Sequence, residues 1–422
     1  MIRNLLLLPS LLAVFATPSA GDLLAIRVGK AETVSQGTIE HAVILVDDGR
    51  ITAVGEDLPV ERGIPILDRP EWVVMPGLVN CYSRAGMDSR AGNDFSPAMR
   101  ASDELYGRQE IYGELLELGV TTLGLYPAGS GVPGQAVAIK PHGLRADEMV
   151  LADGVYLKAT LESNPNSKKL LRKGFEQVDK YDEKVEKARD KWQKAQDKKS
   201  KKKKKSKKDD DKKEDDDKKS KSKKDADEAF VPPAPDAELA PFVDARRGEL
   251  PVLFRIQKAA DYLHLLDVLE DEDDVAFHLR VPLRNDIDLY HVADRIGERE
   301  LHVVLDPRLT YQPNSRRERN IPAEVHAAGG HVALIPLGDS VAGHGRWRTD
   351  VGYLVGHSLD RDAALEAMTL APARVLGLDE RLGSIENGKD ANLVFFDGDP
   401  FEPSTNVQAV MLEGHFVYEK AD

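Results

Sequence analysis

The sequence predicts an α/β fold, a (β/α)8 barrel of the TIM type with a small composite β-sandwich formed by the N- and C-terminal segments. Two observations support this expectation. Eight short apolar runs alternate with amphipathic stretches through the middle of the 422-residue chain, as in parallel strands covered by helices on both faces. Both ends of the chain are instead rich in short β-type runs separated by turn signals.

Residues 1–20 have the pattern of a secretory signal peptide. Arg3 precedes a 12-residue apolar stretch from Leu5 to Ala16, and small residues follow it. The stretch is short for a membrane span and Pro9 interrupts it, so we expect cleavage and export rather than a membrane anchor. The predicted location is periplasmic or extracellular.

The two parts of the β-sandwich are expected at residues 21–72 and 379–422. Asp47-Asp48-Gly49-Arg50 is a hairpin turn signal between two β-rich runs. The predicted strand runs of this unit are Leu23–Val28, Ala42–Val46, Ile51–Val54, Ala391–Phe396, Val407–Leu412 and Phe416–Tyr418.

The barrel is expected in two halves, at residues 73–167 and 246–378. Its predicted strands are Val73–Val79, Val120–Tyr126, Gln135–Lys140, Val155–Leu161, Val252–Ile256, Val275–Leu279, Leu301–Leu305 and His331–Leu337. Amphipathic stretches follow several of them, at Asp261–Glu270, Asp288–Ile296, Arg317–Ala328 and Asp360–Leu376. The segments between strands two, three and four are brief for full helices, so we expect that side of the barrel to be irregular.

A charged insert at residues 168–245 interrupts the barrel. Residues 168–196 are expected to be helical, and residues 197–229 form a Lys/Asp/Ser tract that we expect to be disordered. From Lys198 to Glu228 the chain has 16 lysines and ten acidic residues, so this tract carries +6 and the rest of the chain carries −20. The acidic body argues against nucleic-acid binding. The insert is either a solvated loop or a tether to an anionic surface or a partner.

The C-terminal third carries a family resemblance. Ala-Ala-Leu-Glu-Ala-Met-Thr at 363–369 is followed by Gly-Ser-Ile-Glu-Asn-Gly-Lys-Asp-Ala-Asn-Leu at 383–393. These stretches resemble the amidohydrolase superfamily, close to its imidazolonepropionase-like members. Leu118–Thr122, Leu250–Arg255 and Pro336–Ser340 resemble the family's strands two, five and eight. The resemblance implies a metal-dependent hydrolase of non-peptide carbon–nitrogen bonds.

The first barrel strand also resembles the family, but without its metal ligands. Met75–Val79 fit the family's approach to a His-x-His pair, whereas Tyr82 and Arg84 stand where the two histidines are expected. Arg255 stands where strand five of the family ends in a metal-binding histidine. Asp339 matches the family's aspartate, which binds metal and shuttles a proton.

Arginine has no lone pair to donate, so it cannot bind a metal ion. We therefore expect no metal cofactor, and we hypothesise that Arg84, Arg255 or both pair with Asp339 in place of the metal. In the alternative, Asp339 caps a turn and the arginines extend into solvent. A zinc ion is expected only if a site is rebuilt around Asp339 and His278, with His142 and His344.

Three other side chains need an interpretation. Cys81, the only cysteine, is expected to be a buried inert thiol, with a nucleophile as the alternative. Some family members use a carboxylated lysine on strand four, but we expect Lys140 and Lys158 to be surface residues.

Two functions are open. The resemblance implies a hydrolase, but the lost ligands favour a pseudoenzyme that serves as a binding protein or as the partner subunit of an active amidohydrolase paralogue. Homo-oligomerisation is the other expected association.

Overall fold

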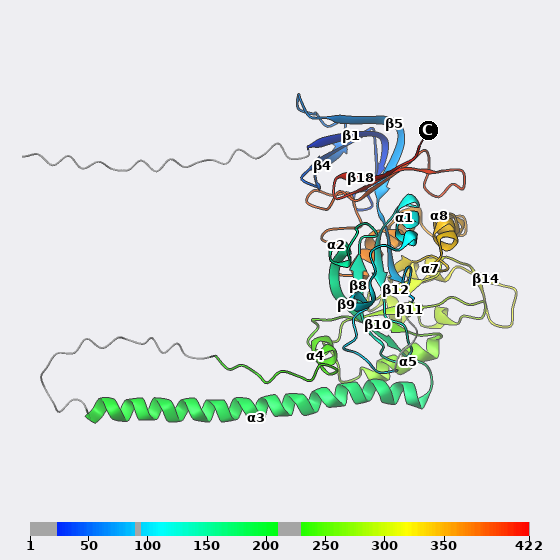
Figure 1. Cartoon of the computed structure of the whole chain (residues 1–422). Coiled ribbons are helices and arrows are strands. Elements are labelled where there is room, and N and C mark those ends of the chain that lie inside the picture. Colours follow the sequence, from blue (N-terminus) through cyan, green and yellow to red (C-terminus); the bar gives the residue numbers. More distant parts are fainter. Residues whose placement is uncertain (1–22, 89–93, 210–228, 422) are drawn as a thin grey trace, which may run out of the picture.

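A computed structural model describes residues 23–88, 94–209 and 229–421. It contains two eight-stranded sheets, one at the middle of the chain and one built from both ends (Figure 1). The predicted signal peptide and most of the Lys/Asp tract lie outside the described residues. In the part of the chain that the structure describes, none of the helices has the length and apolar character needed to cross a membrane.

The central sheet forms a nearly closed barrel, and seven of the eight predicted strands lie in it. The first prediction, Val73–Val79, was wrong in its bounds, because residues 73–76 end β5 (Ile66–Pro76) of the other sheet and only Leu78 and Val79 belong to the barrel. The order of the central sheet is β15-β12-β11-β10-β9-β8-β7-β6. The strands are β6 (Leu78–Ser83), β7 (Val120–Leu125), β8 (Gly134–Ile139), β9 (Val150–Thr160), β10 (Val252–Arg255), β11 (Phe277–Val281), β12 (His302–Leu305) and β15 (His331–Leu334).

One side of the barrel is irregular, as predicted. Its strands are not all parallel, so the expectation of a parallel sheet throughout was wrong on this side. β8 runs antiparallel to both β7 and β9, whereas the other neighbours in the sheet are parallel. Only a loop joins β7 to β8, and only the four-residue helix α2 (Ala146–Met149) precedes β9. A parallel crossover requires a longer connection, so these short links impose antiparallel pairing.

The edge strands β6 and β15 are not paired with each other in the hydrogen-bonded sheet. The helices α9 (Arg361–Met368) and α10 (Leu370–Val375) contact both of them. Ala371, Ala373 and Val375 belong to the same buried cluster as Val79 and Ala333, which come from the two edge strands. The two helices therefore cover the seam of the barrel.

The second sheet joins the two ends of the chain. Its order is β18-β17-β16-β5-β1-β3-β4, with β2 beside β1. The strands are β1 (Leu24–Glu32), β2 (Thr38–Glu40), β3 (Ala42–Asp47), β4 (Arg50–Glu56), β5 (Ile66–Pro76), β16 (Leu393–Phe396), β17 (Val407–Leu412) and β18 (His415–Glu419). The antiparallel pair of β5 and β16 unites the ends, and the sandwich form of this unit stays a prediction.

Gly77 links the two sheets, between β5 and β6. A β-carbon at this position would overlap the side chain of Thr121, which lies in the neighbouring strand β7. The close approach explains why the apolar run needs Pro76-Gly77 at this point.

The insert contains the helix α3 (Pro165–Asp209), which is longer than the helix predicted from the sequence. Leu171, Phe175, Val178 and Tyr181 are buried near its start, where α3 contacts α4 (Ala240–Arg246) and α5 (Ala259–Val268). The rest of α3 extends past the barrel (Figure 1). Residues 197–209, which we expected to be disordered, thus continue this helix.

The other elements lie between the barrel strands or before the end sheet. They are α1 (Glu110–Glu117), α6 (Ala293–Gly297), α7 (Ile321–Ala327), α8 (Val341–Val355), β13 (Thr310–Tyr311) and β14 (Glu318–Arg319).

Candidate functional site

The barrel mouth, at the carboxyl ends of the barrel strands, brings together the side chains that the sequence singled out. Tyr82 and Arg84 lie at the end of β6 and just beyond it. Arg255 ends β10 and is paired in register with Arg280 of β11. Active sites of (β/α)8 barrels form at this end of the strands.

A buried ion pair joins Arg280 to Asp306 in the mouth. The Arg280 guanidinium donates to the Asp306 carboxylate and to the backbone oxygens of Val281 (2.9 Å) and Val304 (3.3 Å). The other Asp306 oxygen accepts from the backbone N–H of Leu283 at 2.8 Å. Arg280 and Asp306 are 7% and 9% exposed, so each charge depends on the other for compensation.

Aromatic rings fill the space beside this pair. Tyr82 and Tyr126 stack with their ring centroids 3.9 Å apart, and the Arg280 guanidinium lies 5.5 Å from the Tyr82 centroid. Arg84 donates to the backbone oxygen of Tyr126 at 2.7 Å. Burial raises the pKa of both tyrosine hydroxyls, so both stay neutral near pH 7.

Lys158 of β9 is buried in the mouth, which corrects the expectation of a surface lysine. It is 4% exposed, and its Nζ lies 4.3 Å from the Tyr126 centroid and donates to the backbone oxygen of Gly129 at 3.0 Å. These contacts favour the charged amine. Burial, together with the positive charges of Arg255 and Arg84, outweighs them and lowers the pKa of Lys158 to about 7. Lys140 is half-buried and pairs with Glu413 at 2.6 Å.

Asp339 does not make the ion pair predicted from the sequence. Its carboxylate accepts a hydrogen bond from the Ser83 hydroxyl at 2.7 Å. Within the described ranges, no salt bridge of 4.0 Å or less joins Asp339 to Arg84 or Arg255. The carboxylate that does pair with a guanidinium in the mouth is Asp306, which the sequence did not single out.

The histidines proposed for a rebuilt zinc site lie apart. His344 of α8 is buried, where its Nε2 accepts from the Asn80 side chain (3.1 Å) and its Nδ1 donates to the Ser340 oxygen (3.0 Å). His142 lies in the loop after β8, beside α1. His278 lies at the amino end of β11, the end away from Asp339.

His278 begins a row of three imidazoles, which we call the histidine stack. His302 of β12 lies 5.2 Å from His278 between ring centroids, and His331 of β15 lies 4.8 Å from His302. The Nδ1 atoms of His278 and His302 are buried without a hydrogen-bond partner. Burial lowers the pKa of His278 to about 4 and that of His302 to about 3. Both rings are therefore neutral near pH 7.

The side chains at the mouth do not fit a divalent ion. The guanidiniums of Arg84, Arg255 and Arg280 have no lone pair, and their charge repels a cation. Over the described ranges, no three histidine, cysteine, aspartate or glutamate side chains are arranged to hold a metal ion. Cys81 is fully buried, and burial raises the pKa of its thiol to about 12, so it has no thiolate character for metal binding or attack.

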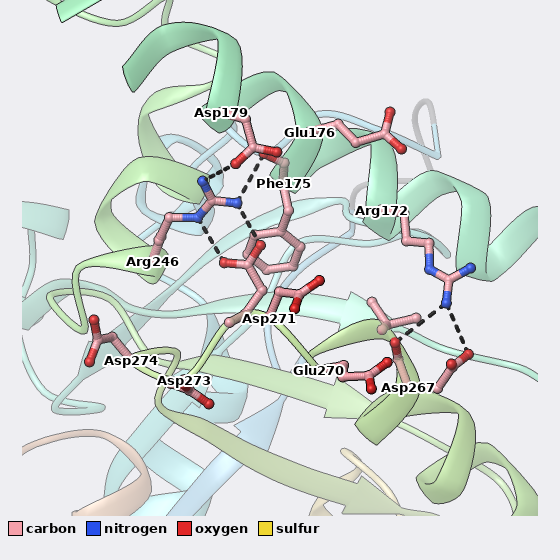
Figure 2. Close-up of a pocket in the computed structure, with 12 residues that line it drawn as sticks. Arg172, Phe175, Glu176, Asp179, Arg246, Asp267, Glu270, Asp271, Asp273 and Asp274 are labelled. Atoms are coloured by element: carbon pink, nitrogen blue, oxygen red, sulfur yellow. Dashed lines mark hydrogen bonds and ion pairs between the residues drawn. The ribbon is translucent and has the colours of Figure 1, made fainter. Parts of the chain in front are cut away.

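The structure also contains an acidic hollow of about 560 Å³ between α3, α4 and α5 (Figure 2). Two arginines tie its walls together. Arg246 of α4 pairs with Asp179 of α3 (2.6 Å) and with Glu272 (2.5 Å), and Arg172 of α3 pairs with Asp267 of α5 (3.0 Å). These ion pairs attach the base of the insert helix to the barrel, which is a structural role.

Comparisons with known proteins agree with this fold. A model described as the amidohydrolase family matches residues 347–417. A 5-methylthioadenosine/S-adenosylhomocysteine deaminase of Nitratidesulfovibrio vulgaris is 37% identical over 90 residues, covering 19% of this chain and 20% of that protein. The chain thus matches about a fifth of the length of that curated relative.

Solved structures extend the likeness to nearly the whole chain. An amidohydrolase from Thermotoga maritima superposes with a TM-score of 0.73 at 20% identity, over 94% of this chain and 100% of that one. An atrazine chlorohydrolase from Arthrobacter aurescens, solved in complex with zinc, has a TM-score of 0.50 at 14% identity, over 94% and 95% of the two chains. At such identities the likeness shows the fold alone.

Proposed function

We propose that the chain belongs to the amidohydrolase superfamily, and that its barrel does not carry out metal-dependent hydrolysis and acts instead as a binding protein. The observation that carries the proposal is the Arg280–Asp306 ion pair. It places a fixed positive charge and its counter-ion in the mouth, where the chemistry of metal-dependent hydrolysis would need lone pairs directed at a divalent cation.

The ion pair also determines what the neighbouring acid can do. A metal ion in this mouth would have to compete with Arg280 for Asp306, and breaking a buried pair leaves an uncompensated charge at a cost of about 3–5 kcal/mol. Asp339 keeps an acceptor role toward Ser83. In metal-dependent hydrolysis such a carboxylate takes the proton of a water that the metal has activated, so Asp339 would depend on a bound metal for that role.

The alternative is a hydrolase of non-peptide carbon–nitrogen bonds, which the family membership itself favours. The two functions differ in an assay of purified mature protein. We would measure bound metal by mass spectrometry and turnover of cyclic amides, N-acyl amino acids and aminopurine nucleosides, with and without chelator. Our proposal expects little bound metal and no turnover above buffer. Chelator-sensitive turnover by a metal-loaded protein would establish the alternative.

Export and association are part of the same proposal. We propose that residues 1–20 are removed on export to the periplasm or the extracellular space. As a binding protein, the chain would act alone, as a homo-oligomer or beside an active paralogue. N-terminal sequencing of protein recovered outside the cytoplasm tests the first point, and co-purification of a histidine-bearing paralogue tests the last. Recovery of uncleaved protein in the cytoplasm would reject export.

A further inference from the structure

We propose that the barrel mouth binds a small anion through a carboxylate or phosphate group, held by Arg255 and Lys158 with Arg84 beside them. This inference rests on the proposed function, because it assigns the binding protein a ligand class. The charge of the mouth would then be inverted relative to a metal centre, with cations from the protein and an anion as the ligand.

Basic side chains gather at the mouth. Among the described residues, Arg84, Lys158, Arg255 and Arg280 lie there near the carboxylates of Asp306 and Asp339. Asp306 is taken by Arg280, and Asp339 accepts from Ser83. Arg255 and Lys158 lie close to each other, and among the described residues neither forms a salt bridge.

The pKa of Lys158 is lowered mainly by burial and further by the nearby positive charges. Its Nζ has two carbonyl acceptors, those of Gly129 and Pro127, and one aromatic face, yet its ammonium form is disfavoured. Part of the cause is repulsion from Arg255 and Arg84. A half-buried group of like charges destabilises the folded chain, and such arrangements are typical of functional sites.

Arg255 supplies the geometry for recognition. Its side chain is half-buried at the end of β10, and within the described ranges its guanidinium makes no hydrogen bond or salt bridge. A guanidinium presents parallel N–H groups that match the two oxygens of a carboxylate or phosphate. An anion bound there would compensate Arg255 and favour the protonated form of Lys158, whose third N–H would be available to it.

The test uses dialysed mature protein whose metal content has been measured. Its thermal unfolding is followed with inorganic phosphate, with succinate, and with chloride at the same ionic strength. We expect phosphate, succinate or both to raise Tm by roughly 2–4 °C above chloride. A response to only one of them identifies the anionic group. Arg255→Gln and Lys158→Met should each weaken binding by about tenfold or more in calorimetric titration.

Arg62→Gln is the matched control, because Arg62 is an exposed arginine in the loop between β4 and β5 of the end sheet. It should respond to anions as the wild type does. The inference is overturned if neither anion acts beyond chloride, or if Arg255→Gln and Lys158→Met respond like the wild type, which would indicate a general salt effect. A metal-bearing, hydrolytically active sample would instead refute the proposed function itself.

Discussion

The two ends of the barrel hold opposite kinds of basic side chain. The histidine stack lies at the amino ends of β11, β12 and β15, where its rings are buried and neutral. The carboxyl ends carry the guanidiniums of Arg255 and Arg280. The imidazoles of this stack therefore lie at the end of the barrel opposite its mouth. Position along the strand, rather than the number of histidines, decides whether a barrel can hold a catalytic metal.

The largest effect expected is at the mouth. Asp306→Asn leaves Arg280 buried without a counter-charge, so we expect the free energy of unfolding to fall by about 3–5 kcal/mol in urea denaturation. Glu183→Gln, in the exposed pair with Lys187, should change it by less than about 0.5 kcal/mol. A loss below about 1 kcal/mol in Asp306→Asn would mean that the Arg280–Asp306 pair is not a buried, mutually dependent pair.

Lys158 should make the stability of the folded chain depend on pH above pH 7. The pKa of Lys158 is about 7 in the folded chain and 10.5 for the free side chain, so between these values the unfolded chain binds more protons and stability rises with pH. From pH 7 to pH 9 the wild type should gain about 2 kcal/mol relative to Lys158→Met. Parallel stability curves for the two proteins would show that Lys158 is not held in its neutral form.

The histidine stack should make the stability of the folded chain depend on pH in a second range, below pH 6.5. The folded-state pKa of His302, about 3, lies below its usual 6.5, so the unfolded chain takes up the proton first and stability falls as the pH drops below 6.5. Between pH 6.5 and pH 5 the wild type should lose about 1.5 kcal/mol more than His302→Leu. His291→Leu, at an exposed histidine, should follow the wild type.

The smallest effect is expected in the middle of the barrel. The Tyr156 hydroxyl of β9 donates to the backbone oxygen of Cys81 in β6 at 3.1 Å. Tyr156→Phe should cost about 1 kcal/mol of stability, the net worth of one buried hydrogen bond. Tyr353→Phe, at a tyrosine that is 56% exposed, provides the comparison and should be neutral. Equal effects in both would indicate that the Tyr156–Cys81 bond contributes nothing.

The barrel could be predicted from the sequence because each strand is a distinct apolar run. Seven of the eight runs became strands of one sheet, whereas the run from Val73 to Val79 is divided between the two sheets at Gly77. The direction of β8 could not be predicted with the same certainty, because a buried run reads alike in parallel and antiparallel pairing. The extent of α3 was underestimated, because its Lys-rich end has no apolar face to indicate a helix.

The site was harder to predict. Tyr82, Arg84 and Arg255 were identified from the family resemblance, which implies metal-binding histidines at these positions, and the mouth does bring them together. Arg280 and Asp306 were missed, because an isolated charge at the end of an apolar run usually marks a solvated strand end. Arg280 could have been identified from its spacing of two residues from His278. This spacing puts both side chains on the same face of β11, the face that points into the barrel.

The central claim, that the basic side chains of the mouth prevent metal binding, is tested most directly by offering zinc to the dialysed protein. After equilibrium dialysis against roughly 10 µM zinc near neutral pH, we expect less than about 0.1 bound ion per chain, because guanidiniums occupy the mouth and cannot act as ligands. About one ion per chain, lost in Asp339→Asn, would place a metal in the mouth and contradict this account.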